Sequence, residues 1–206
     1  VSYRGNEFSY RVGAPGEHWT LNSLAVLAAV DALGGDVAAA SRSLATVAPP
    51  SGRGARHRVT IAGGTLELID ESYNASPTSM RAAFSVLAQT APGPNGSRIA
   101  VLGDMLELGA DAAVLHADLA GALADARVDL VFTCGNLMEN LDRALPASLR
   151  GAHAENSAAL LPVVTAALCA GDVVTVKGSL GSKMKPIVDA ILALGSSDQR
   201  SRGGQG

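Results

Sequence analysis

Aromatic residues are scarce in this 206-residue chain, at 3% of the sequence, and cysteine occurs only twice. A hydrophobic content of 48% still predicts a sizeable core, which must be built mainly from Ala, Val and Leu. Cys134 and Cys169 each lie in apolar sequence, which favours reduced core residues of a cytosolic protein over a disulfide. The charged content is 17% and the net charge -3, which excludes a general electrostatic attraction to nucleic acid or anionic membranes.

Long hydrophobic runs are also absent. Asp31 and Gly34 interrupt the longest apolar run before it reaches the roughly 18 residues of a membrane-spanning helix. The start of the chain lacks the basic and apolar regions of a signal peptide, so we expect a cytoplasmic protein without membrane insertion. The chain begins at Val1 in strand-like sequence, with a turn at Gly5-Asn6, and not at Met. We interpret this as the start of a piece of a longer protein.

Several motifs that would identify a function are missing. The sequence holds no G-x-x-x-x-G-K-[ST] phosphate loop and no G-x-G-x-x-G after a strand. It also holds no Cys/His set with zinc spacing and no G-x-S-x-G nucleophile elbow. The chain alone therefore carries none of the common phosphate, zinc or serine-hydrolase sites.

The first quarter of the chain differs in pattern from the rest. It predicts helices over 20–33 and 36–47, with Thr20 and Asp36 as N-caps. A Gly- and Arg-rich stretch over 51–56 lacks apolar periodicity, and we interpret it as a linker at a domain boundary. The predicted parts are residues 1–52, residues 53–195 and a disordered, Gly-rich tail over 196–206.

Strands and helices alternate after the linker. The strands are nearly unbroken apolar runs, as expected when helices cover both faces of a sheet. This alternation predicts an α/β domain with a doubly wound, mostly parallel sheet flanked by helices. The predicted strands are 58–63, 65–70, 98–104, 128–135 and 172–179, and the predicted helices are 76–89, 111–126, 157–170 and 184–194.

Polar side chains follow four of these strands at the point where each ends. Four such strand ends suggest one rim at an edge of the sheet, and in open parallel sheets ligands bind beyond the C-terminal ends of the strands. Loops of this kind are also polar in the absence of a ligand, so the pattern leaves open both a site and ordinary loop composition. The four groups are Asp70-Glu71-Ser72-Tyr73-Asn74, Gly103-Asp104-Met105, Cys134-Gly135-Asn136 and Lys177-Gly178-Ser179.

The adjacent acids Asp70 and Glu71 are the first candidates. If the strand continues through both, their side chains point to opposite sides, so one could face a ligand and the other could orient the loop. A carboxylate here could accept hydrogen bonds from ribose hydroxyls or hold an ammonium group. One acid could instead cap the next helix, but Ser76 followed by Pro77 already supplies a cap. A functional role for at least one acid is favoured.

Other candidates carry a positive or titratable side chain. Lys177 could neutralise a carboxylate or phosphate, or it could be a solvated lysine in a turn. Ser179 could open a helix whose N-terminus favours an anion. Arg53, flanked by glycines, could reach a phosphate or be a solvated linker charge. His18 lies four residues before Asn22 and could share its helix face, although a histidine there is usually structural. His116, within an apolar helix, is expected to be a core or half-buried residue.

Six segments in order resemble the Mur ligase family. They are similar to the end of its central domain and to its whole C-terminal domain, over most of residues 13–195. The D-[DE]-S-Y-N-A-x-P-x-S-M run followed by L-G-D-M-x-E-L-G is typical of the members that add D-Ala-D-Ala. The segments are GEHWTLNSLAVLAAVDALGGD, PPSGRG, LIDESYNASPTSMRAAFSVL, AVLGDMLELG, LHADLAG and VTVKGSLGSKM.

The resemblance implies a Rossmann-like fold for residues 53–195, preceded by the end of the central ATP-binding domain. It implies that ATP phosphorylates the terminal carboxylate of UDP-MurNAc-tripeptide and that the amino group of D-Ala-D-Ala attacks the acyl phosphate. In the family the central domain supplies the phosphate loop, the magnesium ligands and a carbamylated lysine, all expected upstream of Val1. The chain alone is therefore expected to be inactive, cytoplasmic and monomeric, without nucleic-acid partners.

The resemblance also assigns the nucleotide-binding residues. Asn22 matches the family asparagine near the adenine, with His18 beside it. Arg53 matches the linker arginine that reaches the ATP phosphates, and it is a candidate for a catalytic role. Asp70 and Glu71 match the acidic position at the ribose.

The dipeptide side is assigned in the same way. Tyr73, Asn74 and Ser76 match the segment that lines it. Lys177 and Ser179 match the last strand-end loop, which we expect near the dipeptide carboxylate, and Lys177 is the second candidate for a catalytic role. Two alternatives stay open: another Mur-type ligase, including a folylpolyglutamate synthase-like enzyme, and a non-catalytic module that binds a small ligand.

Overall fold

The computed structural model describes residues 1–3, 6–14 and 16–202, and side chains are described for these residues except 3, 6, 18 and 196–202. The chain divides into two compact units, residues 1–49 and residues 50–206. The division falls a few residues before the boundary that the sequence predicted after residue 52. The assignment of the first unit to a central domain stays a prediction.

The first unit consists of a short hairpin and two helices. The first helix begins at Glu17, before the predicted Thr20, and its N-cap is Gly16. Asp36 caps the second helix as predicted, since its carboxylate accepts a hydrogen bond of 2.9 Å from the Ala39 N–H. The elements are β1 (Ser2–Tyr3), β2 (Asn6–Glu7), α1 (Glu17–Ala32), α2 (Val37–Ser43) and the 3-10 turn η1 (Leu44–Thr46).

The second unit is built on a six-stranded sheet with the order β3-β4-β8-β5-β6-β7. All neighbouring pairs are parallel except β3 and β4, which form an antiparallel hairpin at one edge. The mostly parallel sheet is confirmed. Its strands are β3 (Ala55–Ile61), β4 (Gly64–Glu71), β5 (Arg98–Gly103), β6 (Leu130–Cys134), β7 (Arg150–Ala154) and β8 (Val173–Lys177).

Two features of the sheet correct the sequence prediction. The linker predicted over 51–56 is shorter, because Ala55 and Arg56 already pair with β4. Strand β7 was not predicted at all. Its sequence, RGAHA, has no apolar run, because an edge strand exposes much of its surface to solvent.

The helices of the second unit follow the predicted alternation. Ser76 caps α3 as predicted and forms a capping box with Ser79. The helix predicted over 111–126 is divided at Asp118, and α6 was not predicted. Helix α8 continues to Arg202, so the segment predicted as a disordered tail begins as a helix. The elements are α3 (Pro77–Gln89), η2 (Gly109–Asp111), α4 (Ala112–Ala117), α5 (Leu119–Asp125), α6 (Met138–Ala144), η3 (Ala147–Leu149), α7 (Ser157–Ala167), η4 (Leu180–Ser182) and α8 (Lys185–Arg202).

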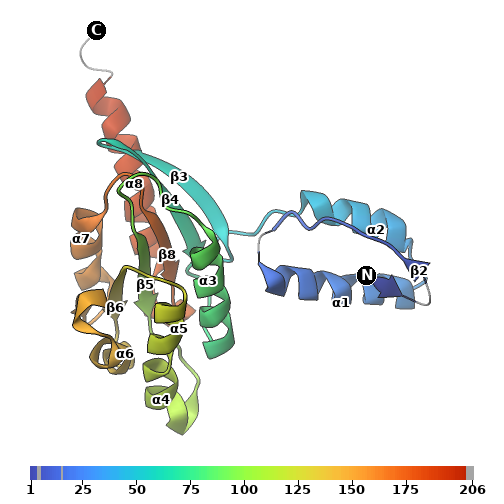
Figure 1. Cartoon of the computed structure of the whole chain (residues 1–206), viewed down its shortest axis with the longest axis horizontal. Helices are drawn as coiled ribbons and strands as arrows, with labels where there is room; N and C mark the ends of the chain where they lie inside the picture. The colour runs from blue at the N-terminus through green and yellow to red at the C-terminus, as the bar shows by residue number, and fades with distance from the viewer. Residues whose placement is uncertain (4–5, 15, 203–206) are drawn as a thin grey trace. The chain divides into compact units, whose positions relative to one another are not determined.

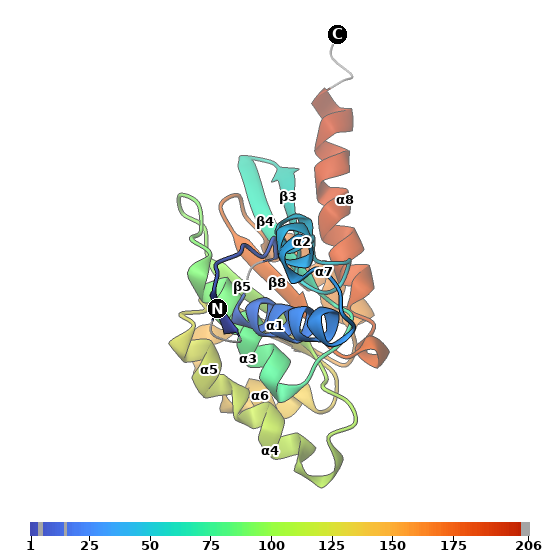
Figure 2. The ribbon, with the colours of Figure 1, turned by 90° about the vertical axis from the view of Figure 1, so that its right-hand side faces the viewer.

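The helices form a layer on each face of the sheet. Helices α3, α5 and α6 pack on one face through side chains such as Phe84 and Leu87. Helices α7 and α8 pack on the other through side chains such as Ile187 and Ile191. Figure 1 shows α3 and α7 on opposite sides of the sheet, and Figure 2 shows α8 beside the β3–β4 hairpin on which it packs. Each fully buried Leu, Ile or Phe contributes about 1.5–3 kcal/mol, so both layers stabilise the frame that positions the strand ends.

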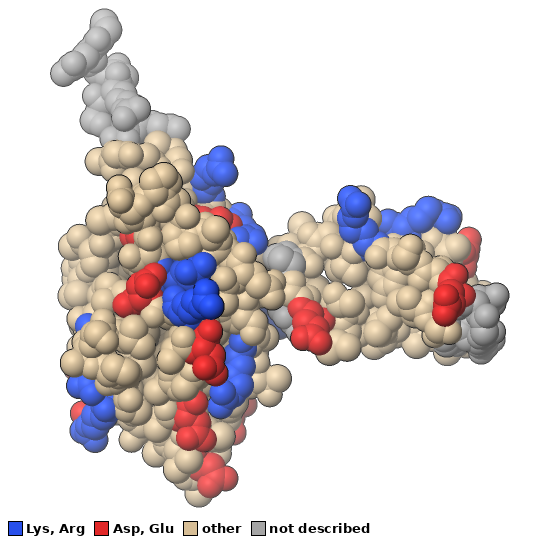
Figure 3. Space-filling model, in the orientation of Figure 1, with Lys and Arg blue, Asp and Glu red and all other residues tan. Residues whose placement is uncertain are grey.

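The charged surface of the second unit is mixed. On the face drawn in Figure 3, acidic and basic side chains of this unit lie interspersed. No helix in the described part of the chain has the length and hydropathy needed to cross a membrane.

Candidate functional site

The parallel strands bring the predicted polar groups to one edge of the sheet. Glu71 at the end of β4 is in register with Lys177 at the end of β8. Lys177 is in register with Leu102 of β5, and Gly103 of β5 with Cys134 of β6. The four groups therefore form one continuous rim, as the sequence predicted from strand ends alone.

Asp70 is fully buried and holds its own loop together. Its carboxylate accepts hydrogen bonds from the backbone N–H groups of Gly52, at 3.0 Å, and Ser72, at 3.1 Å. The Ser72 hydroxyl donates a third, at 2.6 Å. A carboxylate with this set of partners is not presented to a ribose in this structure. It instead fixes the turn that contains Arg53.

Lys177 is also occupied. Its side chain is 3% exposed, and its ammonium group forms an ion pair of 3.2 Å with Glu71. It donates a further hydrogen bond of 2.9 Å to the Asn74 carbonyl. Burial lowers the pKa of Lys177, Glu71 opposes this shift, and the positive charge of Arg53 adds to it. The buried ammonium group joins β8 to the loop after β4, so Lys177 is neither a solvated lysine nor open to a ligand here.

The remaining predicted residues of this loop are likewise held by protein groups. The Asn74 side-chain oxygen accepts a hydrogen bond of 2.8 Å from the Ala75 N–H. The Ser179 hydroxyl accepts one of 2.9 Å from the Leu106 N–H. The helix that Ser179 opens is only a 3-10 turn of three residues, Leu180–Ser182. The role of Ser179 at an anion stays a prediction. Ser76 is used as the α3 cap.

Arg53 and Tyr73 point outward as a pair. The Arg53 guanidinium lies 4.2 Å from the centre of the Tyr73 ring, and both residues are exposed. Gly52 permits this arrangement with a φ of 76°, since a Cβ there would lie 2.9 Å from the Tyr73 Cβ. Arg53 is therefore a cation on an ordered turn rather than a flexible linker charge.

The other two nucleotide candidates belong to the first unit. Asn22 is an exposed residue of α1. The His18 side chain lies outside the described residues. Their roles at the adenine stay predictions.

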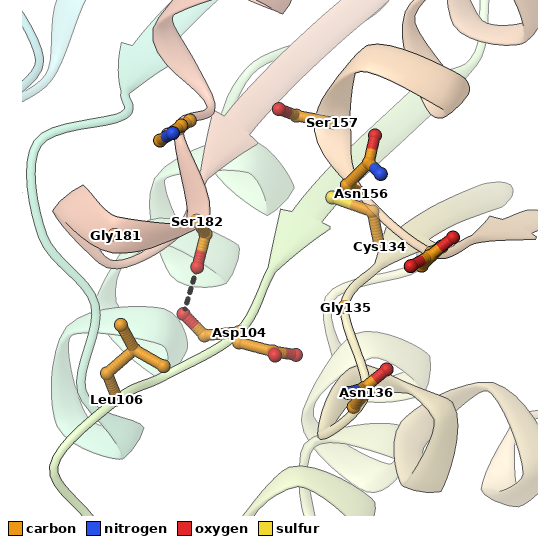
Figure 4. Close-up of a pocket in the computed structure, with 11 residues that line it drawn as sticks. Asp104, Leu106, Cys134, Gly135, Asn136, Asn156, Ser157, Gly181 and Ser182 are labelled. Carbon is orange, nitrogen blue, oxygen red and sulfur yellow. Dashed lines mark hydrogen bonds between the residues drawn. The ribbon is translucent and has the colours of Figure 1, made fainter.

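A pocket of about 340 Å³ opens beyond the ends of β5, β6 and β7. Figure 4 shows the Asp104 carboxylate directed from the end of β5 toward the Gly135–Asn136 loop, with Ser182 bonded to the Asp104 main chain on the other side. The pocket is within the usual range of about 300–1,000 Å³ for small-molecule sites. It is lined by Asp104, Leu106, Cys134, Gly135, Asn136, Glu155, Asn156, Ser157, Gly181, Ser182 and Lys183.

The strand-end groups that the sequence predicted contain four of the eleven lining residues, and the other seven were missed. Residues 155–157 follow β7, the strand that was not predicted, so no strand end was expected there. The Asn156-Ser157 pair is a helix N-cap signal and could have indicated a strand-to-helix loop. In the structure, Asn156 is the N-cap of α7, since its side-chain oxygen accepts a hydrogen bond of 3.0 Å from the Ala159 N–H.

Asp104 is the best-anchored acid of the pocket. Its carboxylate accepts a hydrogen bond of 2.7 Å from the Met138 N–H. Its main-chain oxygen accepts bonds from the Ser179 N–H, at 3.0 Å, and the Ser182 hydroxyl, at 2.8 Å. Gly135 lies against the carboxylate with a φ of 106°, and a Cβ there would come within 2.4 Å of it. Only glycine fits this position.

The lining carries both signs of charge. Asp104 and Glu155 supply carboxylates, and Lys183 supplies an ammonium group. Lys183 has a φ of 52°, a left-handed conformation that is uncommon for a residue other than glycine and that clusters at functional sites. Helix α7 begins at Ser157, and the partial positive charge of its N-terminus would stabilise a bound anion. Such a lining suits a zwitterion with a carboxylate and an amine.

Cys134 does not supply a nucleophile to the pocket. Burial, together with the negative charge of Asp104, raises the pKa of its thiol to about 12. It is buried as predicted, whereas Cys169 is exposed and not a core residue. Helix α7 ends at Ala167, so the apolar sequence around Cys169 lies beyond the packed helix. Among residues 1–3, 6–14 and 16–202, no group of three or more His, Cys, Asp or Glu side chains could hold a metal ion.

Comparison with known proteins places this domain in a family. The pattern of the family described as Mur ligase, glutamate ligase domain, matches residues 57–180. The chain is 35% identical to the UDP-N-acetylmuramoyl-tripeptide--D-alanyl-D-alanine ligase of Mycobacterium tuberculosis over 206 aligned positions, covering 89% of the chain and 39% of that protein. The chain thus spans about two fifths of this curated relative.

Solved structures agree on the fold. MurF from Acinetobacter baumannii superposes with a TM-score of 0.72 at 28% identity, over 89% of this chain and 39% of that one. The MurF ligase of Thermotoga maritima, solved in complex with ADP, gives a TM-score of 0.73 at 21% identity, over 93% of this chain and 42% of that one. The chain belongs to the Mur ligase family.

Proposed function

We propose that the chain is the C-terminal part of an ATP-dependent ligase that joins D-Ala-D-Ala to UDP-MurNAc-tripeptide through an amide bond. The observation that carries the proposal is the match to curated ligases of this name, over 89% of the chain in the case of the M. tuberculosis protein. Residues 1–52 would be the end of the central domain and residues 53–195 the C-terminal domain. The complete protein would act as a monomer in the cytoplasm.

The dipeptide would occupy the pocket beyond β5, β6 and β7. Lys183 and the first N–H groups of α7 would bind its carboxylate. Asp104 and Glu155 would face its amino group. This changes the role of Lys177, which the resemblance assigned to the dipeptide carboxylate. Because the Lys177 ammonium group donates hydrogen bonds to Glu71 and to the Asn74 carbonyl, it would stabilise the rim without contacting the dipeptide.

The nucleotide would lie on the other part of the rim. Arg53 is exposed and could contact the ATP phosphates, with Tyr73 holding its guanidinium in place. Asp70 would act indirectly, because it fixes the Gly52 turn that presents Arg53. ATP supplies the phosphoryl group that activates the acceptor carboxylate. The resemblance assigns the magnesium ligands to the central domain and the adenine to His18 and Asn22.

The test is phosphate release by the complete ligase that contains this chain. The reaction would hold ATP, magnesium and UDP-MurNAc-tripeptide with D-Ala-D-Ala, a single amino acid, glutamate or no amine. Release that requires D-Ala-D-Ala would support the proposal. Release with a single amino acid or glutamate would assign the protein to a related ligase. No release with any amine, from a folded protein, would favour a binding module.

A further inference from the structure

His116 of α4 is fully buried between two backbone groups. Its Nε2 lies 2.9 Å from the Met105 backbone nitrogen, and its Nδ1 lies 2.6 Å from the Ala112 carbonyl oxygen. A backbone N–H can only donate and a carbonyl can only accept. The two contacts therefore require a proton on Nδ1 and a free lone pair on Nε2. The ring is a neutral imidazole in one defined tautomer.

Met105 lies between two residues that line the pocket, Asp104 and Leu106. The backbone of this segment, residues 104–106, is hydrogen-bonded at each of the three residues. Ser179 donates its N–H to the Asp104 carbonyl, His116 accepts the Met105 N–H, and the Ser179 hydroxyl accepts the Leu106 N–H. The segment is thus fixed from the β8 side by Ser179 and from the α4 side by His116.

An apolar side chain of similar size could fill the space of His116 but could not replace its acceptor. Met105 is itself fully buried, so its N–H would be left without a partner and out of reach of water. A buried donor without an acceptor is costly, and the segment would shift until the donor reached one. Asp104 and Leu106 would move with it, because they are its immediate neighbours.

We propose that His116 is a positioning residue for the pocket. Its Nδ1–H tautomer holds the Met105 N–H and thereby sets the Asp104 carboxylate where it meets the amine of the bound dipeptide. The dipeptide part of this inference rests on the proposed function. The part that concerns the loop rests on the hydrogen bonds alone.

Three variants test the proposal. His116→Leu removes the acceptor, whereas His116→Gln can place an amide oxygen near the position of Nε2 and keep the bond. Leu119→Ala, in the neighbouring helix α5, is the control for lost core packing, since Leu119 is fully buried and its hydrocarbon side chain offers no acceptor to the Met105 N–H. The ring nitrogens of His116 and the exchange rate of the Met105 amide proton are measured by NMR on the 206-residue chain. The kinetic constants are measured on the complete ligase.

We expect a pyrrole-type Nδ1 and a pyridine-type Nε2 in the wild type. Exchange of the Met105 amide should accelerate at least about tenfold in His116→Leu and stay slow in His116→Gln. In His116→Leu, kcat/KM for D-Ala-D-Ala should fall about 10- to 100-fold with KM for ATP within about twofold, as one unpaired buried donor implies. His116→Gln should recover most of this loss, and Leu119→Ala should show little of it.

Several results would overturn the proposal. One is a proton on Nε2. Another is an equal kinetic loss in His116→Leu and Leu119→Ala, which would mean that His116 only contributes packing. A wild-type ligase that uses an amine other than D-Ala-D-Ala would overturn the dipeptide role together with the proposed function. The tautomer and the exchange rates would still decide the loop-holding role on their own.

Discussion

Asp70 offers the sharpest test of how the rim is built. The substitution Asp70→Asn keeps the size of the side chain but replaces one carboxylate oxygen by an NH2 group. In the wild type, one oxygen accepts the Gly52 N–H and the other accepts the Ser72 N–H and hydroxyl. An amide can satisfy only one of these sides. Its NH2 group must face a buried N–H on the other.

The expected cost follows from these contacts. One buried backbone donor left without an acceptor costs about 1–3 kcal/mol. The bonds that remain lose their charged acceptor, which weakens each by about 1 kcal/mol. One or two bonds remain, according to the side that the amide oxygen faces, so the sum is a loss of about 2–5 kcal/mol from a free energy of unfolding that is typically about 5–15 kcal/mol. The control is Glu67→Gln on the same strand, whose half-exposed ion pair with Arg56 is worth about 0–1 kcal/mol.

The assay is urea unfolding followed by far-UV circular dichroism, combined with hydrogen exchange of the two backbone amides. Exchange at Gly52 and Ser72 reports on the site directly, which matters in a chain of two compact units. The reasoning is refuted if Asp70→Asn is as stable as Glu67→Gln and both amides stay protected. In that case, a weaker affinity of Asp70→Asn for ATP would support the contact between Asp70 and the ribose that the resemblance implies.

Three further predictions concern the thiols, the buried lysine and the glycines. In the native protein at neutral pH, a thiol reagent should modify Cys169 quickly and Cys134 only after unfolding, and equal rates would contradict the burial of Cys134. Because burial lowers the folded-state pKa of Lys177 below its usual 10.5, the unfolded state binds more protons in the window just below 10.5. The free energy of unfolding of the wild type relative to that of Lys177→Met should therefore rise with pH in that window. A difference that does not change with pH would contradict this prediction. Gly135→Ala should destabilise by about 1–3 kcal/mol because of its φ and its carboxylate neighbour, whereas Gly121→Ala in α5, with open space around it, should stabilise by about 0.4–1 kcal/mol. Urea unfolding of both glycine variants checks the sign.

The sequence could predict the strands that are buried on both faces and the rim at their ends. Strand β4 reads as an apolar run before Asp70, and parallel pairing alone puts its end beside Lys177. The order of six family segments then predicted the family. These inferences depend on local pattern and on general topology, which a single sequence carries.

The tertiary partners could not be predicted in this way. Lys177 and Glu71 lie 106 residues apart, and nothing near either residue indicates that each neutralises the other. Strand β7 was missed because an edge strand lacks the apolar run of a central one, and the part of the pocket formed by residues 155–157 was missed with it. Cys169 was expected in the core because its neighbours are apolar, but the helix ends before it reaches that position.

The measurement that tests the central claim most directly is the kinetics of Lys183→Met in the complete ligase. Lys183 lines the pocket, whereas Lys185, two residues later, does not: its ammonium group pairs with Asp189 and lies 4.0 Å from the Asp70 carboxylate. Lys185→Met is therefore the matched control. The account predicts that KM for D-Ala-D-Ala rises about tenfold in Lys183→Met, as loss of a charged hydrogen bond implies, with KM for ATP unchanged. An unchanged KM for the dipeptide, or a rise in KM for ATP alone, would contradict the placement of the dipeptide in this pocket.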